Sequence, residues 1–186
     1  MFNTNKYEQL MSDIGKGTKE SLVDTEDSEG PGYEIRAATF VIQKYIERPF
    51  LIHGRKFDIR VWMLVTQNKK VYFCREGYIR TSGEAFTLDT ESVEKRSVHL
   101  TNSALQKYSQ AYGKYEDGNQ MSFSDLDSYV EQQGMTKKVK GELTEQIKEA
   151  MVITVMSIRE KLLSMYDHNR NCFELFGFDF ILDEDL

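Results

Sequence analysis

Three charged residues stand at alternate positions of one apolar stretch. Lys56, Asp58 and Arg60 are separated by apolar residues between positions 57 and 61. Side chains alternate between the two faces of a strand, so the three charges are predicted to project from one side and the apolar residues from the other. Because unpaired charges are costly to bury, this pattern predicts a polar cleft that holds a multiply charged ligand. A purely structural row of ion pairs is the alternative interpretation.

Asp179 is the second candidate for chemistry. It stands between Phe178 and Phe180 in the middle of an apolar run. A carboxylate among aromatic side chains needs a cation, and Mg²⁺ bound together with phosphate oxygens is one solution. Pairing with an arginine, or capping of a turn, is the structural alternative. The residues alone leave both open.

The elements that carry these residues are predicted to be strands. An apolar strand over Thr39 to Ile46 leads into a turn at a proline. Residues 61–66 and 71–75 flank a polar tetrapeptide and predict a hairpin. The run from Phe173 to Leu182 is apolar on both faces, which predicts a strand in the centre of a sheet.

Helices are predicted on both sides of this strand-rich part. Apolar residues keep one face from Val139 to Met165, which predicts a single long helix packed on the core. A shorter helix is predicted over Ser124 to Gln132, beginning at a serine cap. Residues 7–14 predict a short amphipathic helix, and residues 18–33 an acidic loop.

Two segments are therefore expected. Residues 1–36 are interpreted as a helix and a flexible acidic segment, and residues 37–186 as a partial domain. The histidines His53, His99 and His168 lack metal-ligand spacing and are interpreted as surface or packing residues.

Composition excludes several classes of protein. No apolar run approaches the roughly 18 residues that cross a bilayer. The first residues lack the pattern of a secretory signal. Two cysteines, Cys74 and Cys172, are too few for a disulfide framework. We therefore expect a reducing, intracellular compartment.

The charge is distributed unevenly. Between Lys44 and Lys107 there are 12 basic and 7 acidic residues, whereas the remainder holds 12 and 23. The basic part coincides with the predicted cleft. This favours an anionic ligand or partner over nucleic acid, which would require a basic excess across the domain.

Five segments, in their order and spacing, resemble motifs of the tubulin tyrosine ligase and ligase-like family. They are Gln43 to Ile46, Lys56 to Arg60, Arg75 to Ser82, His99 to Asn102 and Phe176 to Phe180. A sixth stretch, Tyr112 to Asn119, is more similar to tubulin tyrosine ligase than to its glutamylating or glycylating relatives. The resemblance implies an α+β fold of the ATP-grasp type, with antiparallel sheets and packed helices, incomplete at both ends.

The resemblance also implies a set of ligands for ATP. The residues implied to contact the nucleotide are Gln43, Lys44, Tyr45, Ile46, Lys56, Asp58, Thr101 and Asn102. Gln43 to Ile46 would lie along adenine, and Thr101 with Asn102 would line the phosphate end.

Catalytic and metal-binding roles follow from the same resemblance. Arg60 and Arg80 would face the phosphates and the carboxylate of a free amino acid, and Asp179 would hold Mg²⁺. The implied reaction activates a carboxylate of tubulin as an acyl phosphate, which the amino group of tyrosine, glutamate or glycine then attacks. The acidic C-terminal tail of tubulin is the expected partner, in the cytoplasm at microtubules or cilia, with no membrane and no nucleic acid.

Two parts of the family pattern have no match. A lysine-bearing, glycine-rich segment is expected ahead of Gln43, and a Glu-x-Asn metal pair is expected beyond the turn at residues 183–185. The 186-residue chain is therefore not expected to ligate an amino acid by itself. A catalytically inactive module that binds tubulin or nucleotide, and a fragment without an independent role, are the other interpretations.

Overall fold

The central element is the strand β1, Arg55–Thr66. Residues 55–59 are all buried, and from Arg60 to Thr66 partly exposed residues alternate with buried ones. Phe57, Ile59 and Val61 point into the hydrophobic core, so Lys56, Asp58 and Arg60 share the opposite face. The predicted one-sided display of the three charges is confirmed.

The computed structural model describes residues 43–162 and 172–186, apart from positions 69, 91, 93, 137 and 138. The helix predicted at 7–14, the acidic loop at 18–33 and the first part of the strand predicted at 39–46 lie outside the described residues.

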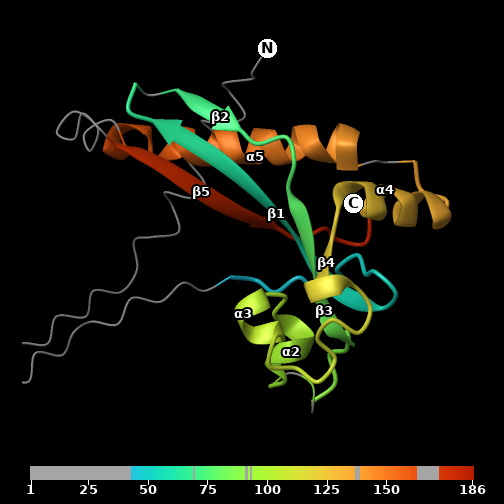
Figure 1. Cartoon of the computed structure of the whole chain (residues 1–186). Coiled ribbons are helices and arrows are strands. Elements are labelled where there is room, and N and C mark those ends of the chain that lie inside the picture. The colour runs from blue at the N-terminus through green and yellow to red at the C-terminus, as the bar shows by residue number, and fades with distance from the viewer. Residues whose placement is uncertain (1–42, 69, 91, 93, 137–138, 163–171) are drawn as a thin grey trace, which may run out of the picture. The chain divides into compact units, whose positions relative to one another are not determined.

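The sheet is antiparallel and is built around β1 (Figure 1). The strand β3, Tyr78–Ala85, pairs with the first half of β1, and the short strand β2, Val71–Phe73, pairs with its second half. The predicted hairpin between β1 and β2 is confirmed. The strand β5, Phe173–Phe180, runs antiparallel along residues 59–66 of β1, on the edge that β2 and β3 leave open. The two-residue strand β4, Gln120–Met121, extends the sheet beyond β3.

Two longer helices supply the other half of the core. The helix α4, Phe123–Gln132, buries Phe123, Leu126 and Val130. The helix α5, Thr144–Ser157, buries Ile147 and Met151 and runs along the sheet (Figure 1). All of these side chains join the same core cluster as the apolar face of β1, which gives the α+β arrangement. None of the helices among the described residues has the length and apolar character to cross a membrane.

Two short helices pack against β3, apart from α4 and α5. They are α2, Arg96–His99, and α3, Ser103–Gln106 (Figure 1). The pairing of β1 with β3 is irregular between Arg55 and Phe57, which leaves residues 82–84 of β3 unpaired with β1. The fully buried Gln106 accepts a hydrogen bond from Gly83 N at 3.0 Å and donates to the carbonyls of Ser97 and Leu100. These bonds fix both helices to the sheet.

A short 3₁₀ turn, η1, Asp117–Asn119, leads into β4. Asn119 is buried and donates from its amide to the carbonyl of Thr81 at 3.0 Å, while its side-chain oxygen accepts from Gly113 N at 2.7 Å. Both bonds hold the segment between residues 112 and 120 in a defined conformation.

Two strand predictions are wrong in the described residues. Residues 43–46 are exposed and form no strand. The strand β5 pairs with β1 alone among the described strands, so it lies at an edge and not in the centre. Phe173 and Leu175 are 69% and 53% exposed. The apolar residues on both faces of β5 therefore did not indicate that this strand is buried on both sides.

The helix predictions need smaller corrections. The long helix from Val139 is interrupted, because Val139–Leu143 is a π-helical turn, η2, in which Lys140 and Gly141 leave helical geometry. After α5, Ile158 forms a turn before residues 159–162 become helical again. Residues 163–165 lie outside the described residues.

The shorter helix exists, but its cap is a different serine. Ser122 Oγ accepts from Asp125 N at 3.1 Å, and the Asp125 carboxylate accepts from Ser122 N at 2.9 Å, which forms a capping box. Ser124 lies inside α4.

Candidate functional site

Three adjacent strands bring four charged side chains together on the polar face of the sheet. Asp58 on β1 lies opposite Arg80 on β3, and Arg60 on β1 lies opposite Asp179 on β5. Because β1 stands between the other two strands, its two charges each meet an opposite charge on a different neighbour. The predicted catalytic residues Arg60 and Arg80 and the predicted metal ligand Asp179 therefore lie in one cluster.

The cluster is continuous. Arg80 donates from Nε and Nη2 to the two carboxylate oxygens of Asp58, at 2.7 and 2.6 Å. Arg80 Nη2 also lies 2.9 Å from Asp179 Oδ2. Arg60 binds both oxygens of Asp179, through Nε and, at 3.0 Å, through Nη2. We call Asp58, Arg60, Arg80 and Asp179 the charge network.

The members of the network differ in burial, and their mutual contacts shift the pKa values of both arginines. Asp58 and Arg80 are 7% and 6% exposed, whereas Arg60 and Asp179 lie nearer to solvent. Burial opposes the charge on Arg80, but the hydrogen bonds and the charge of Asp58, joined by Asp179, raise the pKa of Arg80 above its ordinary value. The hydrogen bond to Asp179 raises the pKa of Arg60 despite partial burial.

The carboxylate of Asp179 is held in its ionised form. Burial alone would raise the pKa of Asp179, but the hydrogen bonds and charges of Arg60 and Arg80 outweigh burial and lower it. Both oxygens of this carboxylate already receive guanidinium donors.

Lys56 lies on the same face of β1 and is only 4% exposed. Its ammonium donates to the hydroxyl of Tyr45 at 2.9 Å and lies 4.4 Å from the centre of the Tyr45 ring and 6.0 Å from that of Phe86. It forms no ion pair with any described residue. This buried cation therefore has capacity for an anionic ligand.

Of the remaining predicted ligands, Thr101 hydrogen-bonds to the charge network and the others do not. Thr101 is buried and donates to Asp58 Oδ2 at 2.6 Å, so it joins the charge network from the segment after α2. Asn102 caps α3 by accepting from Ala104 N at 2.8 Å, and its side chain forms no hydrogen bond with the described residues of the network. Gln43, Lys44 and Ile46 are exposed, and their side chains form no hydrogen bond or ion pair with a described residue.

A model of the tubulin-tyrosine ligase family matches residues 3–186. This chain belongs to that family. The probable alpha-tubulin polyglutamylase Ttll1 of Tetrahymena thermophila is 30% identical over 186 residues, which are 99% of this chain and 41% of the relative. The probable tubulin polyglutamylase TTLL9 of Rattus norvegicus is 33% identical over 88% of this chain and 34% of its own length.

A third relative carries a different activity in its name. The tubulin glycylase 3A of Drosophila melanogaster is 35% identical over 78% of this chain and 14% of its own length. The chain thus spans less than half the length of each of these three relatives.

In this member of the tubulin-tyrosine ligase family, the sequence patterns missed a second ion pair, which is partly buried. Arg55 is 3% exposed and donates to both carboxylate oxygens of Glu116, one of them at 2.9 Å, and to the carbonyl of Ser82 at 3.0 Å. Thr81 donates to Glu116 Oε2 at 2.9 Å, and the guanidinium of Arg55 lies 4.3 Å from the ring centre of Tyr115. The pair fastens the segment before η1 to the sheet.

Glu116 is also held ionised. Burial would raise the pKa of Glu116, but the hydrogen bonds from Arg55 and Thr81 and the charge of Arg55 lower it. The sequence feature that could have singled out Glu116 is its position in the stretch from Tyr112 to Asn119, which resembles tubulin tyrosine ligase.

His99 is a second functional candidate that was interpreted as a surface or packing residue. Its Nδ1 lies 2.8 Å from the hydroxyl of Tyr45, and its Nε2 lies 2.9 Å from the carbonyl of Ser92. The sequence feature that could have singled out His99 is its position as the first residue of the motif His99 to Asn102.

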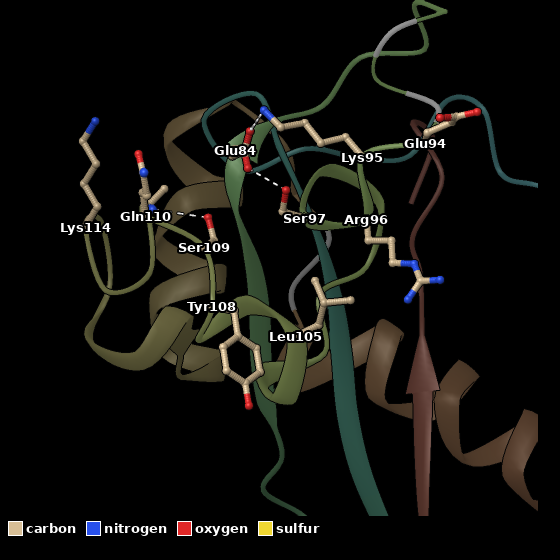
Figure 2. A pocket seen from close by; sticks show the side chains of 11 residues that line it. Glu84, Glu94, Lys95, Arg96, Ser97, Leu105, Tyr108, Ser109, Gln110 and Lys114 are labelled. Carbon is tan, nitrogen blue, oxygen red and sulfur yellow. Dashed lines mark hydrogen bonds and ion pairs between the residues drawn. The ribbon is translucent and has the colours of Figure 1, made fainter.

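A separate groove of about 960 Å³ is lined by Glu84, near the end of β3, and by residues around α2 and α3 (Figure 2). Glu84, on its wall, pairs with Lys95 and accepts from Ser97 at 2.6 Å, and the bonds from Lys95 and Ser97 lower the pKa of Glu84. Arg96 and Lys114, seen at opposite sides of the groove in Figure 2, form no ion pair with a described residue. These two cations can receive acidic groups.

Proposed function

We propose that this chain supplies part of the catalytic domain of an ATP-dependent ligase that joins an amino acid to a carboxylate of tubulin. The observation that carries the proposal is the charge network, which places Arg60, Arg80 and Asp179 on one face of three strands beside the buried Lys56. Membership in the tubulin-tyrosine ligase family supports it. Tyrosine, glutamate and glycine are the candidate amino acids.

The nucleotide is expected to bind along the polar face of the sheet, in an ATP-grasp domain that includes residues 37–186. Lys56 fits a phosphate group, because its buried ammonium contacts only neutral groups among the described residues. Asp58 and Thr101 would line the same face. Residues 43–46 would lie along adenine, with Asn102 at the phosphate end.

Arg60 and Arg80 would act on charge that develops during carboxylate activation. The acceptor carboxylate attacks the γ-phosphoryl group to form an acyl phosphate and release ADP, and the amino group of the amino acid then displaces phosphate. Fixed guanidinium groups stabilise the negative charge that spreads over the transferred phosphoryl oxygens. Their positions are set by Asp58 and Asp179, so no reorientation is required when the charge appears.

Asp179 is the residue of this chain that would hold Mg²⁺, which would neutralise phosphate charge when bound. Among the described residues no group of three or more acidic, histidine or cysteine side chains could hold a metal. Further ligands would therefore come from the nucleotide and from residues outside the described ones. The carboxylate of Asp179 suits this role because it is ionised.

The acceptor is expected to be the acidic C-terminal tail of tubulin, reached in the cytoplasm at microtubules. Arg96 and Lys114, which line the groove at the end of β3, would offer positive charge to an acidic peptide. Such charge raises the rate of encounter with an acidic peptide more than the final affinity.

An inactive module that binds nucleotide or tubulin is the second candidate. The pairing of Asp179 with two arginines favours it, because a metal would have to compete with both guanidinium groups.

ATP-dependent incorporation of labelled tyrosine, glutamate and glycine into tubulin by the full-length protein tests the proposal. We expect incorporation of one of these amino acids, its loss in Arg80→Met, and its retention in Arg75→Met, which removes an exposed arginine on the connection between β2 and β3. Nucleotide binding without any incorporation would support the inactive module instead.

A further inference from the structure

Three side chains from separate segments form a chain of hydrogen bonds at Lys56. Lys56 Nζ on β1 donates to Tyr45 Oη at 2.9 Å. Tyr45 Oη lies 2.8 Å from His99 Nδ1, at the end of α2. His99 Nε2 lies 2.9 Å from the main-chain carbonyl of Ser92. These hydrogen bonds link Tyr45, which precedes β1, to the motif that begins at His99.

The donor and acceptor capacities of the partners determine where the protons of His99 and Tyr45 lie. The carbonyl of Ser92 can only accept, so His99 Nε2 must carry a proton. In a neutral imidazole Nδ1 is then an acceptor, and the hydroxyl of Tyr45 donates to it. A lone pair of the Tyr45 oxygen remains for the ammonium of Lys56. One arrangement, with neutral His99 as the Nε2–H tautomer, satisfies every group.

Aromatic contacts hold the same arrangement. The His99 ring makes edge contacts with Tyr45 and with Phe86, each with centroids 5.8 Å apart. Tyr45 also presents its ring to Lys56 Nζ. The ammonium of Lys56 is therefore enclosed by one hydroxyl and two aromatic rings, without a carboxylate among the described residues to balance it.

We propose that Tyr45 and His99 are positioning residues that hold the ammonium of Lys56 in place for an anionic group of the nucleotide. The proposal rests on the proposed function, because it assigns Lys56 to the nucleotide. Tyr45 orients Lys56 through its hydroxyl, and His99 orients that hydroxyl by accepting its proton. A neutral oxygen orients the ammonium without neutralising it, so the positive charge stays available to the ligand.

The arrangement depends on the protonation of His99. The groups facing the imidazole are the Tyr45 hydroxyl, the Ser92 carbonyl and the Phe86 ring, with the ammonium of Lys56 behind Tyr45. No carboxylate of a described residue hydrogen-bonds to His99. If Nδ1 gained a proton, it would donate to Tyr45, and the hydroxyl would face two cationic donors. The hydrogen-bond chain to Lys56 therefore requires Nδ1 of His99 to be an acceptor.

Two substitutions of His99 separate its two nitrogens. The Asn side-chain oxygen in His99→Asn can replace Nδ1 as the acceptor for Tyr45, whereas the Gln amide in His99→Gln can replace Nε2 as the donor to Ser92. Tyr45→Phe keeps the ring and removes the hydroxyl. Tyr72→Phe, on an exposed side chain of β2, is the control for loss of a phenol.

The experiment uses the full-length protein labelled with ¹⁵N at histidine, together with titration of ATP. We expect the Nε2–H tautomer for His99 and a shift of its Nδ1 resonance in Tyr45→Phe. ATP affinity should fall about fivefold to tenfold in Tyr45→Phe and His99→Gln, which corresponds to one lost hydrogen bond. It should stay within about twofold in His99→Asn and Tyr72→Phe.

The outcomes distinguish this proposal from the proposed function. If the wild-type protein binds ATP but His99→Gln and His99→Asn bind it equally well, or if His99 carries its proton on Nδ1, the positioning role is overturned. If the wild-type protein does not bind ATP, the proposed function fails and the positioning role falls with it. The histidine spectrum reports the hydrogen-bond chain in either case.

Discussion

Asp58 on β1 accepts two hydrogen bonds from Arg80, the residue directly opposite it on β3, at 2.7 and 2.6 Å. This pairing brings a planar guanidinium against both oxygens of a carboxylate, the geometry in which such pairs are strongest. Thr101 adds a third hydrogen bond to Asp58, and Asp179 adds a second partner to Arg80. The pair therefore links the strands that meet at the site.

Removal of Arg80 should cost stability as well as activity. In Arg80→Met the buried carboxylate of Asp58 keeps Thr101 as its one side-chain partner among the described residues, so we expect the free energy of unfolding to fall by about 3 kcal/mol. Urea denaturation of the protein measures it. The double variant Asp58→Asn with Arg80→Met should recover part of the loss, because no unpaired charge remains buried. A double variant no more stable than the single one would contradict this explanation.

The pair of Arg55 and Glu116 predicts a specific dependence on pH. The pKa of Glu116 lies below its ordinary value of 4.5, so its ionisation stabilises the folded state above that pH and the benefit is lost as the pH falls through the folded-state pKa. Glu116→Gln should therefore be less stable than wild type at pH 7, by about 3 kcal/mol, since Arg55 is left buried without a charge partner. The difference should narrow below about pH 4.

Denaturation at several pH values gives this comparison. Glu76→Gln, which changes an exposed carboxylate on the connection between β2 and β3, is the control and should follow wild type throughout. A constant difference between Glu116→Gln and wild type from pH 7 to about pH 3 would show that ionisation of Glu116 is not the cause.

The alternation of charged and apolar residues was sufficient to predict β1. Lys56, Asp58 and Arg60 share a face because the period of a strand is two, and that property is local. The hairpin to β2 followed from its turn for the same reason. The α+β class required no more than these patterns and the helices on the core.

The partners of those charges could not be predicted from local pattern. Arg80 meets Asp58 because of the register between β1 and β3, which is shifted by an irregularity beside Arg55. Asp179 meets Arg60 because β5 pairs along the other edge of β1, 119 positions away in sequence. Arg55 and Glu116 are separated by 61 positions, and nothing close to either residue indicates the other. The resemblance to a family supplied the grouping that physical periodicity could not.

The wrong predictions have the same origin. Gly141 lies within the long helix predicted from Val139 onwards, yet its backbone leaves helical geometry there. Apolar residues on both faces of β5 predicted a central strand, but strand composition does not reveal how many neighbours a strand has. Burial depends on what packs against an element, which a single segment does not encode.

Gly77, on the segment that leads into β3, packs closely against β1. A Cβ atom at this position would lie 2.3 Å from the main-chain oxygen of Arg60 and 2.8 Å from Cζ of Phe123. Because the first of these atoms belongs to the backbone, Gly77→Ala must displace β1 near Arg60. We expect a loss of about 2 kcal/mol in the free energy of unfolding. Arg75→Ala, an exposed position two residues earlier, is the control and should change stability by less than about 0.5 kcal/mol.

Asp179 should distinguish free nucleotide from its magnesium complex. Its carboxylate lies beside Arg60 and Arg80, so Asp179→Asn removes a negative charge that competes with phosphate for these two guanidinium groups. Metal-free ATP should therefore bind the variant about threefold more tightly than wild type, since like charge at a phosphate site opposes binding. The same change removes the one residue proposed to hold Mg²⁺, so the enhancement of binding by magnesium should disappear. Titration of the full-length protein with ATP, in excess EDTA and in excess Mg²⁺, measures both effects.

Glu174→Gln changes an exposed carboxylate on the same strand and should leave both affinities unchanged. If Asp179→Asn kept the full enhancement by magnesium, Asp179 would be a structural partner of the two arginines and not a metal ligand. A loss of affinity in EDTA would instead mean that Arg60 and Arg80 need this carboxylate to hold their positions. The two conditions together therefore separate the electrostatic, metal-binding and orienting roles that the geometry of the charge network allows.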